Sequence, residues 1–499
     1  MKSKTLISII LVTFASIFIS CNDLLEETEF TYALASSTFY NSPDEANAAV
    51  LAPLDIMRTA YDANWFATLE INTEYVYPKG VYTGYNVNGI VNTTHETRLT
   101  NNWSRIYRAI SFCNVAIERL PAANAMTQEQ IDPFLGELRF IRALNYFNLV
   151  RHWGSVPLRT EKNLGVWDLK KSTVAEIYSF IIDDLLFAIE KSPETPRLVG
   201  TPGKNAAKAV LAEVYMFTGD YPQAKKYAGE VISSNKYSIV NVASVRDFDK
   251  VFGYDLVTSS EEVFYVKTSR TDSKTWDYLS YTAHPQYYIE PGKRMLNGFG
   301  YFTHYTDLRN KVISEWDQND LRYGRNVGFY VFGADAYGQY TCLLTKYWDP
   351  NASGSGANVS IPLIRYTDVL ITYAEASARV AGAPTEESIE IVNMIKRRAY
   401  GFPFNQANAE IDYKLSDYNS LDKFIDLLIR EETYERMNEA KHWDFIVRLG
   451  KAQELVGKYL NVTGAPTTIA EKHFLWKLPD SEFNYNKALD KTVDQNPGY

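Results

Sequence analysis

Apolar positions recur with a helical period along much of the chain, and residues 205–234 show this pattern most clearly. Two apolar faces there flank the turn Gly219-Asp220-Tyr221-Pro222. Gly219 suits a left-handed helix end, and Pro222 suits the first turn of the following helix. The spacing fits one tetratricopeptide-like pair of antiparallel helices. Such a pair cannot bury its apolar face alone, so we expect neighbouring pairs. The alternative is an isolated helical hairpin in an unrelated fold.

Further helices are expected on both sides of this pair. Ser42 and Glu45 form a capping-box pattern that starts a helix running to about Tyr61, and Thr173 with Glu176 starts another. Residues 134–153 are apolar nearly all round, which predicts a buried central helix. Apolar periodicity predicts the other helices over these ranges: 103–117, 364–380, 386–399 and 421–449.

The helical period is absent from two regions. Residues 72–101, rich in Tyr, Gly and Asn, are expected to form a long loop, and loops of that length are usually functional. Residues 237–360 read as loops with short strands at 263–266, 327–332 and 340–347. We therefore expect a mainly α protein with one domain over 42–499. Its parts are a helical array (42–236 and 361–450), a loop-rich insert (237–360) and an irregular tail (451–499).

The first residues have the features of a bacterial lipoprotein leader. Lys2 and Lys4 precede an apolar stretch that is too short to span a membrane, so residues 1–20 read as a signal peptide. Ser20-Cys21 then resembles a lipoprotein processing site, which would make Cys21 the lipidated first residue of the mature chain. Residues 21–41 are expected to be a tether, and two or more acyl chains would anchor it stably. The alternative is an ordinary secretory leader with a chance cysteine.

Charge and motifs exclude several classes of function. The formal net charge of −9 does not fit a nucleic-acid-binding protein. The pair Glu439 and His442 has a metal-ligand spacing, but a di-iron bundle needs a second copy that the sequence lacks. Interleaved arginines make an ion-paired helix the preferred interpretation. Cys113 and Cys342 lack metal-ligand spacing; Cys113 is expected to be a small buried residue, and a disulfide between the two stays open.

Besides 205–234, several blocks of sequence are distinctive: ELRFIRALNYF (137–147), WGSVPL (153–158), 365–376, 392–399, 429–439, 442–445 and QNPGY (495–499). In their order along the chain, and together with the Cys21 leader, these blocks resemble the SusD/RagB family of surface nutrient-binding lipoproteins from Bacteroidetes. One departure is Lys441-His442, where the family more often has Gly and Arg. The resemblance implies a SusD-like α-helical fold built on four tetratricopeptide-like pairs, with the inserts on one side.

The resemblance also implies a role. The protein would sit on the external face of the outer membrane as a lid over a SusC-like TonB-dependent transporter. It would capture an oligosaccharide and pass it to the transporter without catalysis, cofactor or metal. A peptide-binding member of the family is the alternative, because the acidic charge balance suits basic peptides. A glycan hydrolase is less favoured, since it needs two carboxylates at a defined separation in a cleft.

Aromatic side chains that can stack on sugar rings collect in the two loop regions. Tyr and Trp suit such contacts because each has an apolar face and a polar group. About half of these aromatics are expected to pack the insert or contact the transporter instead. The residues predicted to bind ligand are Tyr77, Tyr82, Tyr85, Asn86 and Asn88 in the first loop, and Trp276, Tyr281, Asn297, Tyr301 and Phe302 in the second.

Overall fold

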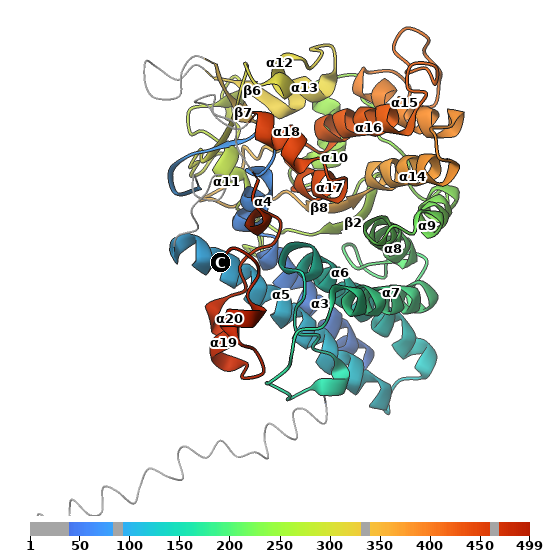
Figure 1. Ribbon diagram of the computed structural model, residues 1–499, viewed down its shortest axis with the longest axis vertical. Coiled ribbons are helices and arrows are strands. Elements are labelled where there is room, and N and C mark those ends of the chain that lie inside the picture. Colours follow the sequence, from blue (N-terminus) through green and yellow to red (C-terminus); the bar gives the residue numbers. More distant parts are fainter. Residues whose placement is uncertain (1–38, 83–92, 331–339, 460–468) are drawn as a thin grey trace, which may run out of the picture.

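The structure is a computed structural model that describes residues 39–82, 93–330, 340–459 and 469–499. The predicted signal peptide, Cys21 and nearly all of the predicted tether lie outside the described residues, as do Tyr85, Asn86 and Asn88. Figure 1 shows helices stacked from the lower end of the molecule to its upper right, with the loop-rich insert at the upper left.

The helical array consists of helices that pack in pairs, most of them close in sequence, with α14 returning to pack on α9 after the insert. The packed pairs are α3 with α5, α6 with α7, α8 with α9, and α14 with both α9 and α15. Their bounds are α3 Pro43–Ala60, α4 Ala63–Glu70, α5 Thr93–Arg119, α6 Gln128–Trp153, α7 Val174–Lys191, α8 Lys204–Thr218, α9 Tyr221–Ser233, α14 Tyr366–Ala381 and α15 Glu386–Ala399. The prediction of a mainly α protein is thereby confirmed.

The predicted helix boundaries depend on local capping, and most are confirmed. Ser42 and Thr173 each form a complete capping box at the starts of α3 and α7. Gly219 ends α8 in the left-handed conformation (φ 79°), and the carboxylate of Asp220 caps α9. Tyr215 stacks on Tyr227 between these two helices, with ring centres 6.0 Å apart. The helix pair at 205–234 therefore forms as the sequence predicts.

Several expectations about secondary structure are wrong. Helix α5 begins at Thr93, inside the region predicted as loop, because Leu99 and Asn102 are buried and Asn102 donates a hydrogen bond to the carbonyl of Ala60 at the end of α3. Residues 364–365 belong to strand β8 (Ile361–Arg365) rather than to a helix. The tail is not wholly irregular: its described part contains the short helices α18 (Ala452–Tyr459), α19 (Asp480–Tyr485) and α20 (Lys491–Asp494).

The helix predicted over 421–449 is also interrupted. It forms as α16 (Leu421–Arg436) and α17 (His442–Arg448), separated by a turn in which Asn438 and Ala440 have positive φ angles of 67° and 57°. The turn directs the carboxylate of Glu439 to the buried guanidinium of Arg365, with Oε1 2.8 Å from Nη2. Tertiary ion pairing thus overrides the helical propensity of this stretch.

The insert is built from short antiparallel strands and single-turn helices. Strands β1 (Tyr77–Pro78), β5 (His304–Asp307), β7 (Thr341–Leu344) and β6 (Val327–Phe329) form one sheet in that order. Strand β2 (Glu262–Val266) pairs with β8, and β3 (Tyr288–Glu290) pairs with β4 (Lys293–Arg294). The strands expected at 263–266 and within 340–347 are confirmed, and that at 327–332 over its first three residues. The short helices are α10 Asp249–Phe252, α11 Leu279–Thr282, α12 Lys311–Ser314 and α13 Leu321–Asn326.

A buried network of ion pairs joins the insert to the helical array. Arg365, at the end of β8, contacts the carboxylates of Glu261, Glu435 and Glu439, and all four side chains are buried. Arg398 from α15 also contacts Glu261 and Glu435. Such a network is costly to desolvate but strongly resists the removal of any one partner. It therefore holds the base of the insert in a fixed position relative to α14, α15 and α16.

Candidate ligand-binding site

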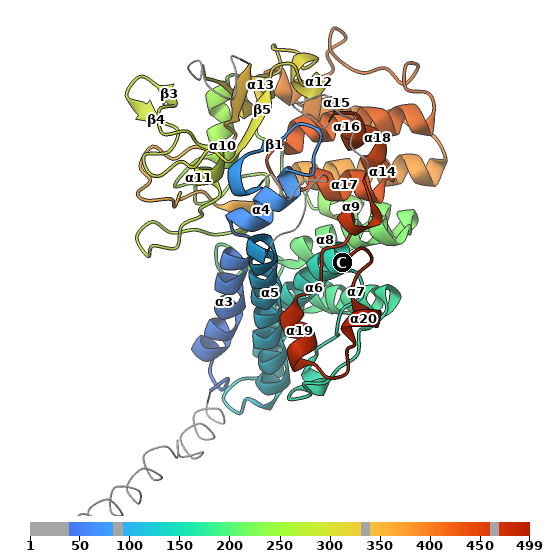
Figure 2. The same cartoon turned by 60° about the vertical axis from the view of Figure 1, so that its left-hand side comes forward.

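The two regions predicted to bind ligand meet in the insert. Strand β1 from the first region pairs with β5 from the second, with Tyr77 opposite Tyr305. The backbone N–H of Lys79 continues this pairing by donating to the carbonyl of Thr303 at 2.8 Å. In Figure 2, β1 and β5 lie together above α4, at the end of the molecule away from the start of α3. Residues more than two hundred positions apart in sequence therefore share one surface.

Aromatic rings from both regions form two contact groups that meet along the chain at Tyr301 and Phe302, here together called the aromatic cluster. Tyr281 is its centre: its ring lies 5.3 Å from that of Tyr82, 5.9 Å from that of Tyr301 and 6.2 Å from that of His304. These separations are typical of favourable aromatic pairs. The members of the aromatic cluster are Tyr82, Tyr281, His284, Tyr301, Phe302 and His304.

The inner part of the aromatic cluster is fixed by polar contacts. The Tyr82 hydroxyl donates a hydrogen bond to Asn64 Oδ1 on α4 at 2.8 Å, and the Arg98 guanidinium lies 4.7 Å from the Tyr82 ring centre. Burial lowers the pKa of His304 to about 3, so its imidazole is neutral. Lys79 Nζ lies 4.2 Å from the ring centre of Phe302. These contacts preorganise the base on which the exposed rings stand.

Two aromatic side chains, Phe299 and Tyr301, are exposed at the edge of the aromatic cluster. They are 68% and 53% exposed. The backbone N–H groups of Phe299 and Tyr301 donate hydrogen bonds to the carbonyls of Gly354 and Ser280. These bonds hold the segment in place. A Cβ atom at Gly298 would lie 1.9 Å from the carbonyl oxygen of Gly354, so only glycine permits this approach. The segment therefore presents two rings to solvent from a rigid backbone.

The other predicted ligand residues lie deeper. Trp276 is 1% exposed: its indole N–H donates to the carbonyl of Tyr61 at 3.0 Å, and Phe66 packs against its ring. Tyr77, Tyr82 and Phe302 are also buried, and Tyr281 is partly buried. Their rings support the surface and offer no open face. Of the predicted aromatics that the structure describes, only Tyr301 is largely exposed.

Sequence reasoning missed Phe299, His284 and Arg98 as members or neighbours of this surface. His284 packs against Phe302 with ring centres 5.6 Å apart. Phe299 has a sequence signal in retrospect, since it stands between Gly298 and Gly300 and therefore has no bulky neighbour to cover it. Arg98 lies on α5, in the stretch that the sequence predicted as loop.

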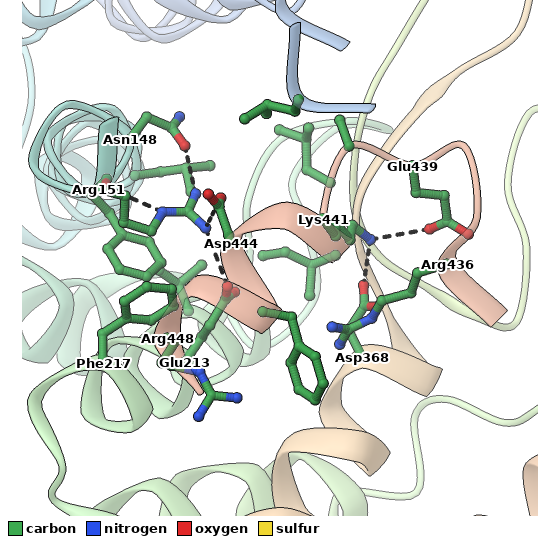
Figure 3. A pocket seen from close by; sticks show the side chains of 18 of the residues that line it. Asn148, Arg151, Glu213, Phe217, Asp368, Arg436, Glu439, Lys441, Asp444 and Arg448 are labelled. Atoms are coloured by element: carbon green, nitrogen blue, oxygen red, sulfur yellow. Dashed lines mark hydrogen bonds and ion pairs between the residues drawn. The ribbon is translucent and has the colours of Figure 1, made fainter. Parts of the chain in front are cut away.

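A cavity of about 90 Å³ lies within the helical array between α6, α8, α14 and α17, apart from the aromatic cluster. Figure 3 shows that its charged side chains point toward one another: Arg151 pairs with Asp444 at 2.9 Å, and Lys441 pairs with Asp368 at 2.6 Å. Burial raises the pKa of Asp444 to about 6, although Arg151 opposes the shift. The cavity is smaller than the roughly 300 Å³ at which ligand pockets begin, so its ion pairs fit a structural role.

Glu439 and His442, which have the metal-like spacing, point to different partners. Glu439 binds Arg365 and Lys346, whereas His442 donates from Nε2 to Glu74 at 3.0 Å and from Nδ1 to Glu432. Within the described ranges, no group of three or more His, Cys, Asp or Glu side chains is placed to hold a metal ion. The interpretation as ion pairs is confirmed, with these groups buried rather than solvated. Cys113 and Cys342 are both free and buried.

The fold and the site define a protein of stacked helix pairs that carries an aromatic surface on a loop-rich insert. Residues 254–499 match the sequence profile of the SusD family, and residues 50–216 match a related profile described as starch-binding and associating with the outer membrane. The chain therefore belongs to the SusD/RagB family. No helix in the described part of the chain has the length and apolar character to span a membrane.

Relatives of known sequence and structure agree with this assignment. The chain is 26% identical to SusD-like protein P38 of Formosa agariphila, and the match covers 95% of each. A SusD homologue from Bacteroides thetaiotaomicron superposes with a TM-score of 0.77 at 19% identity, covering 93% of this chain and 99% of that one. Surface glycan-binding protein A of the same species, solved with laminarihexaose, superposes with a TM-score of 0.71 at 17% identity, covering 91% and 99%.

Proposed function

We propose that this protein is a non-catalytic glycan-binding lipoprotein of the cell surface that delivers oligosaccharide to a SusC-like TonB-dependent transporter. The observation that supports this most is the pair of exposed rings, Phe299 and Tyr301, on a fixed aromatic base. Sugar rings have apolar C–H faces that stack on aromatic rings and hydroxyl groups that hydrogen-bond. An aromatic surface with nearby polar groups, such as the exposed Asn297, meets both needs.

The family supplies the ligand class to test first. Surface glycan-binding protein A, which has a similar fold, was solved with laminarihexaose, and another protein of similar fold is described as a laminarin-binding SusD-like protein, so a β-linked gluco-oligosaccharide is our first candidate for this chain. We place the contact at Tyr301 and Phe299, with Tyr281 beneath them, and we keep Tyr85 and Asn86 as further candidates. The buried rings of Tyr77, Tyr82, Trp276 and Phe302 would act by holding this surface in shape.

Anchoring and organisation form part of the same proposal. Cys21 would carry the acyl chains after removal of residues 1–20, and residues 21–41 would tether the body to the external face of the outer membrane. Residues 42–499 would act as one domain, in keeping with a hydrophobic core that extends from Ala46 to Leu478. A coding sequence for a TonB-dependent barrel beside that of this chain would support the transporter partnership.

A ligand screen tests the proposal directly. The chain from residue 22 onward would be titrated by calorimetry with laminarihexaose, other oligosaccharides and a set of basic peptides. We expect binding to at least one oligosaccharide, and chromatography of the incubated sugar should show no cleavage products. Binding of peptides alone would instead favour a RagB-type function, and turnover that is lost on changing one carboxylate would favour a hydrolase.

A further inference from the structure

A second exposed apolar surface lies far from the aromatic cluster, between α6 and α7. Leu164, Val166 and Trp167 are 40%, 46% and 77% exposed, and Gly165 between them has a φ of 78°. We call residues 164–167 the apolar tip. Exposed apolar side chains are common singly, but a contiguous group that includes a Trp marks an interaction surface. Nothing in the proposed glycan site uses it.

The apolar tip is held rigidly by the protein beneath it. Arg159 donates hydrogen bonds to the carbonyls of Val166 and Trp167 at 2.9 and 3.1 Å. Just beyond the tip, the side-chain amide of Asn486 exchanges two hydrogen bonds with the backbone of Leu169, at 2.9 and 2.7 Å. The backbone on both sides of Trp167 is held by these hydrogen bonds, so the Trp167 side chain is exposed from a fixed position.

The residues around the apolar tip suit a lipid surface. The exposed residues Lys162 and Lys170 flank the apolar tip and place a long cationic side chain on each side of it in the sequence. One exposed carboxylate, that of Asp168, lies between the two lysines in the sequence. Peripheral membrane contacts commonly place Trp at the membrane interface and Lys near the lipid head groups. Leu164 and Val166 offer a sugar no hydrogen bonds, so this surface fits hydrocarbon better than glycan.

The position of the apolar tip agrees with this interpretation. In Figures 1 and 2, the segment between α6 and α7 lies at the lower end of the molecule, the end at which the chain enters α3. Asn41, just before α3, accepts hydrogen bonds from the backbone N–H groups of Asn124 and Ala125, in the turn between α5 and α6. Residues 21–38, if extended, would reach about 60 Å. An anchor at Cys21 would therefore leave this end of the body within reach of the bilayer.

We propose that the apolar tip inserts into the head-group region of a lipid bilayer and gives the anchored protein a second point of contact. Trp167 would lie at the interface, with Leu164 and Val166 beneath the head groups and the two lysines near lipid phosphates. Two contacts fix an orientation that a single tether cannot, so the aromatic cluster would be held away from the membrane. This contact depends on the proposed anchoring only for which end of the body lies within reach of the lipid.

The test uses the chain from Cys21 to its end, coupled through the Cys21 thiol to maleimide lipid in phosphatidylcholine–phosphatidylglycerol vesicles. Cys113 and Cys342 are buried and free, so coupling should be selective. Vesicles with brominated acyl chains quench tryptophans that touch the bilayer. We expect quenching in the parent chain that Trp167→Phe removes. Equal quenching in both chains, or none in either, would overturn the proposal.

A second measurement, the partitioning of the uncoupled chain onto vesicles, distinguishes a lipid contact from misfolding and from a contact with another protein. Partitioning of the uncoupled chain onto the same vesicles should fall about tenfold in Trp167→Ala and also in Leu164→Ser/Val166→Ser. Phe402→Ala, which removes a side chain of 40% exposure just after α15, is the matched control and should change nothing. If the two tip variants partition like the parent but no longer co-purify with a transporter, the tip is a protein contact and the lipid proposal is wrong. Glycan affinity, measured in parallel, reports separately on the proposed function.

Discussion

Tyr82 and Tyr281, which come from the two regions predicted to bind ligand, pack with their ring centres 5.3 Å apart. Tyr82 is buried and hydrogen-bonded to Asn64, whereas Tyr281 is partly buried and supports the exposed Tyr301. The candidate site therefore has two layers: an inner layer of rings that fixes its shape and an outer layer that a ligand can touch. The two layers should respond differently to mutation.

Removing an outer ring should weaken binding without unfolding the protein. Tyr301→Ala and Phe299→Ala each delete one exposed stacking face, which we expect to reduce oligosaccharide affinity about fivefold to tenfold. Calorimetric titration measures the affinity, and thermal unfolding should be nearly unchanged. Tyr485→Ala is the matched control, because Tyr485 is 80% exposed on α19, outside the candidate site. Unaltered affinity in the double variant Phe299→Ala/Tyr301→Ala would remove this surface from the proposal.

Removing an inner ring should instead lower stability. Trp276→Ala leaves a cavity among Phe66, Tyr278 and Tyr347, and we expect a loss of about 3–5 kcal/mol in the free energy of unfolding. Tyr82→Phe keeps the ring and removes the hydroxyl that donates to Asn64, so its cost should be about 1 kcal/mol. Denaturant unfolding measures both. A stable Trp276→Ala chain with weakened glycan binding would show that Trp276 contacts ligand.

The helical array was largely predictable from the sequence because its signals are local. Capping boxes at Ser42 and Thr173 and the Gly219 helix end depend on residues within one turn of each other. The start of α5 was not predictable, since Asn102 gains its hydrogen-bond partners from Ala60 at the end of α3 and from Asp62, which caps α4. The break between α16 and α17 likewise depends on Arg365, which lies 74 positions from Glu439.

The location of the candidate site was predictable, but the role of each ring was not. Composition alone showed that aromatics gather near residues 77–85 and 276–302. Whether a given ring is buried depends on the pairing of β1 with β5 and on the close approach of Gly298 to Gly354. Such contacts join segments distant in sequence, so Trp276 and Tyr301 look equivalent in the sequence and differ in the structure.

Arg365 should be the most sensitive position of the junction between insert and array. Arg365→Met leaves the carboxylates of Glu261, Glu435 and Glu439 without one of their cations, which we expect to cost about 3–5 kcal/mol of stability. Arg119→Met, which removes a solvent-exposed pair with Glu118, should change stability little. Urea unfolding of both variants makes the comparison. Similar small losses in both would mean that Arg398 and Lys346 can replace the missing charge.

His442 should make stability depend on pH. Burial alone would lower its pKa, but the carboxylates of Glu74 and Glu432 outweigh burial and raise the pKa well above the ordinary value. The imidazolium therefore stabilises the fold fully below the unfolded-state pKa of about 6.5, and this contribution declines as pH rises toward the folded-state pKa. His442→Arg keeps the charge at every pH, so its stability should decline less than that of the parent above pH 6.5.

The matched variant His442→Gln completes this test. It removes the cation between two buried carboxylates, so we expect a loss of about 3–5 kcal/mol near pH 6. The difference from the parent should shrink as pH rises, because the parent then loses its own imidazolium charge. Denaturant unfolding between pH 5.5 and about 9 measures all three chains across this transition. A parent and a His442→Arg chain with parallel pH profiles would show that His442 is neutral in the folded protein and that its contacts with Glu74 and Glu432 are not ionic.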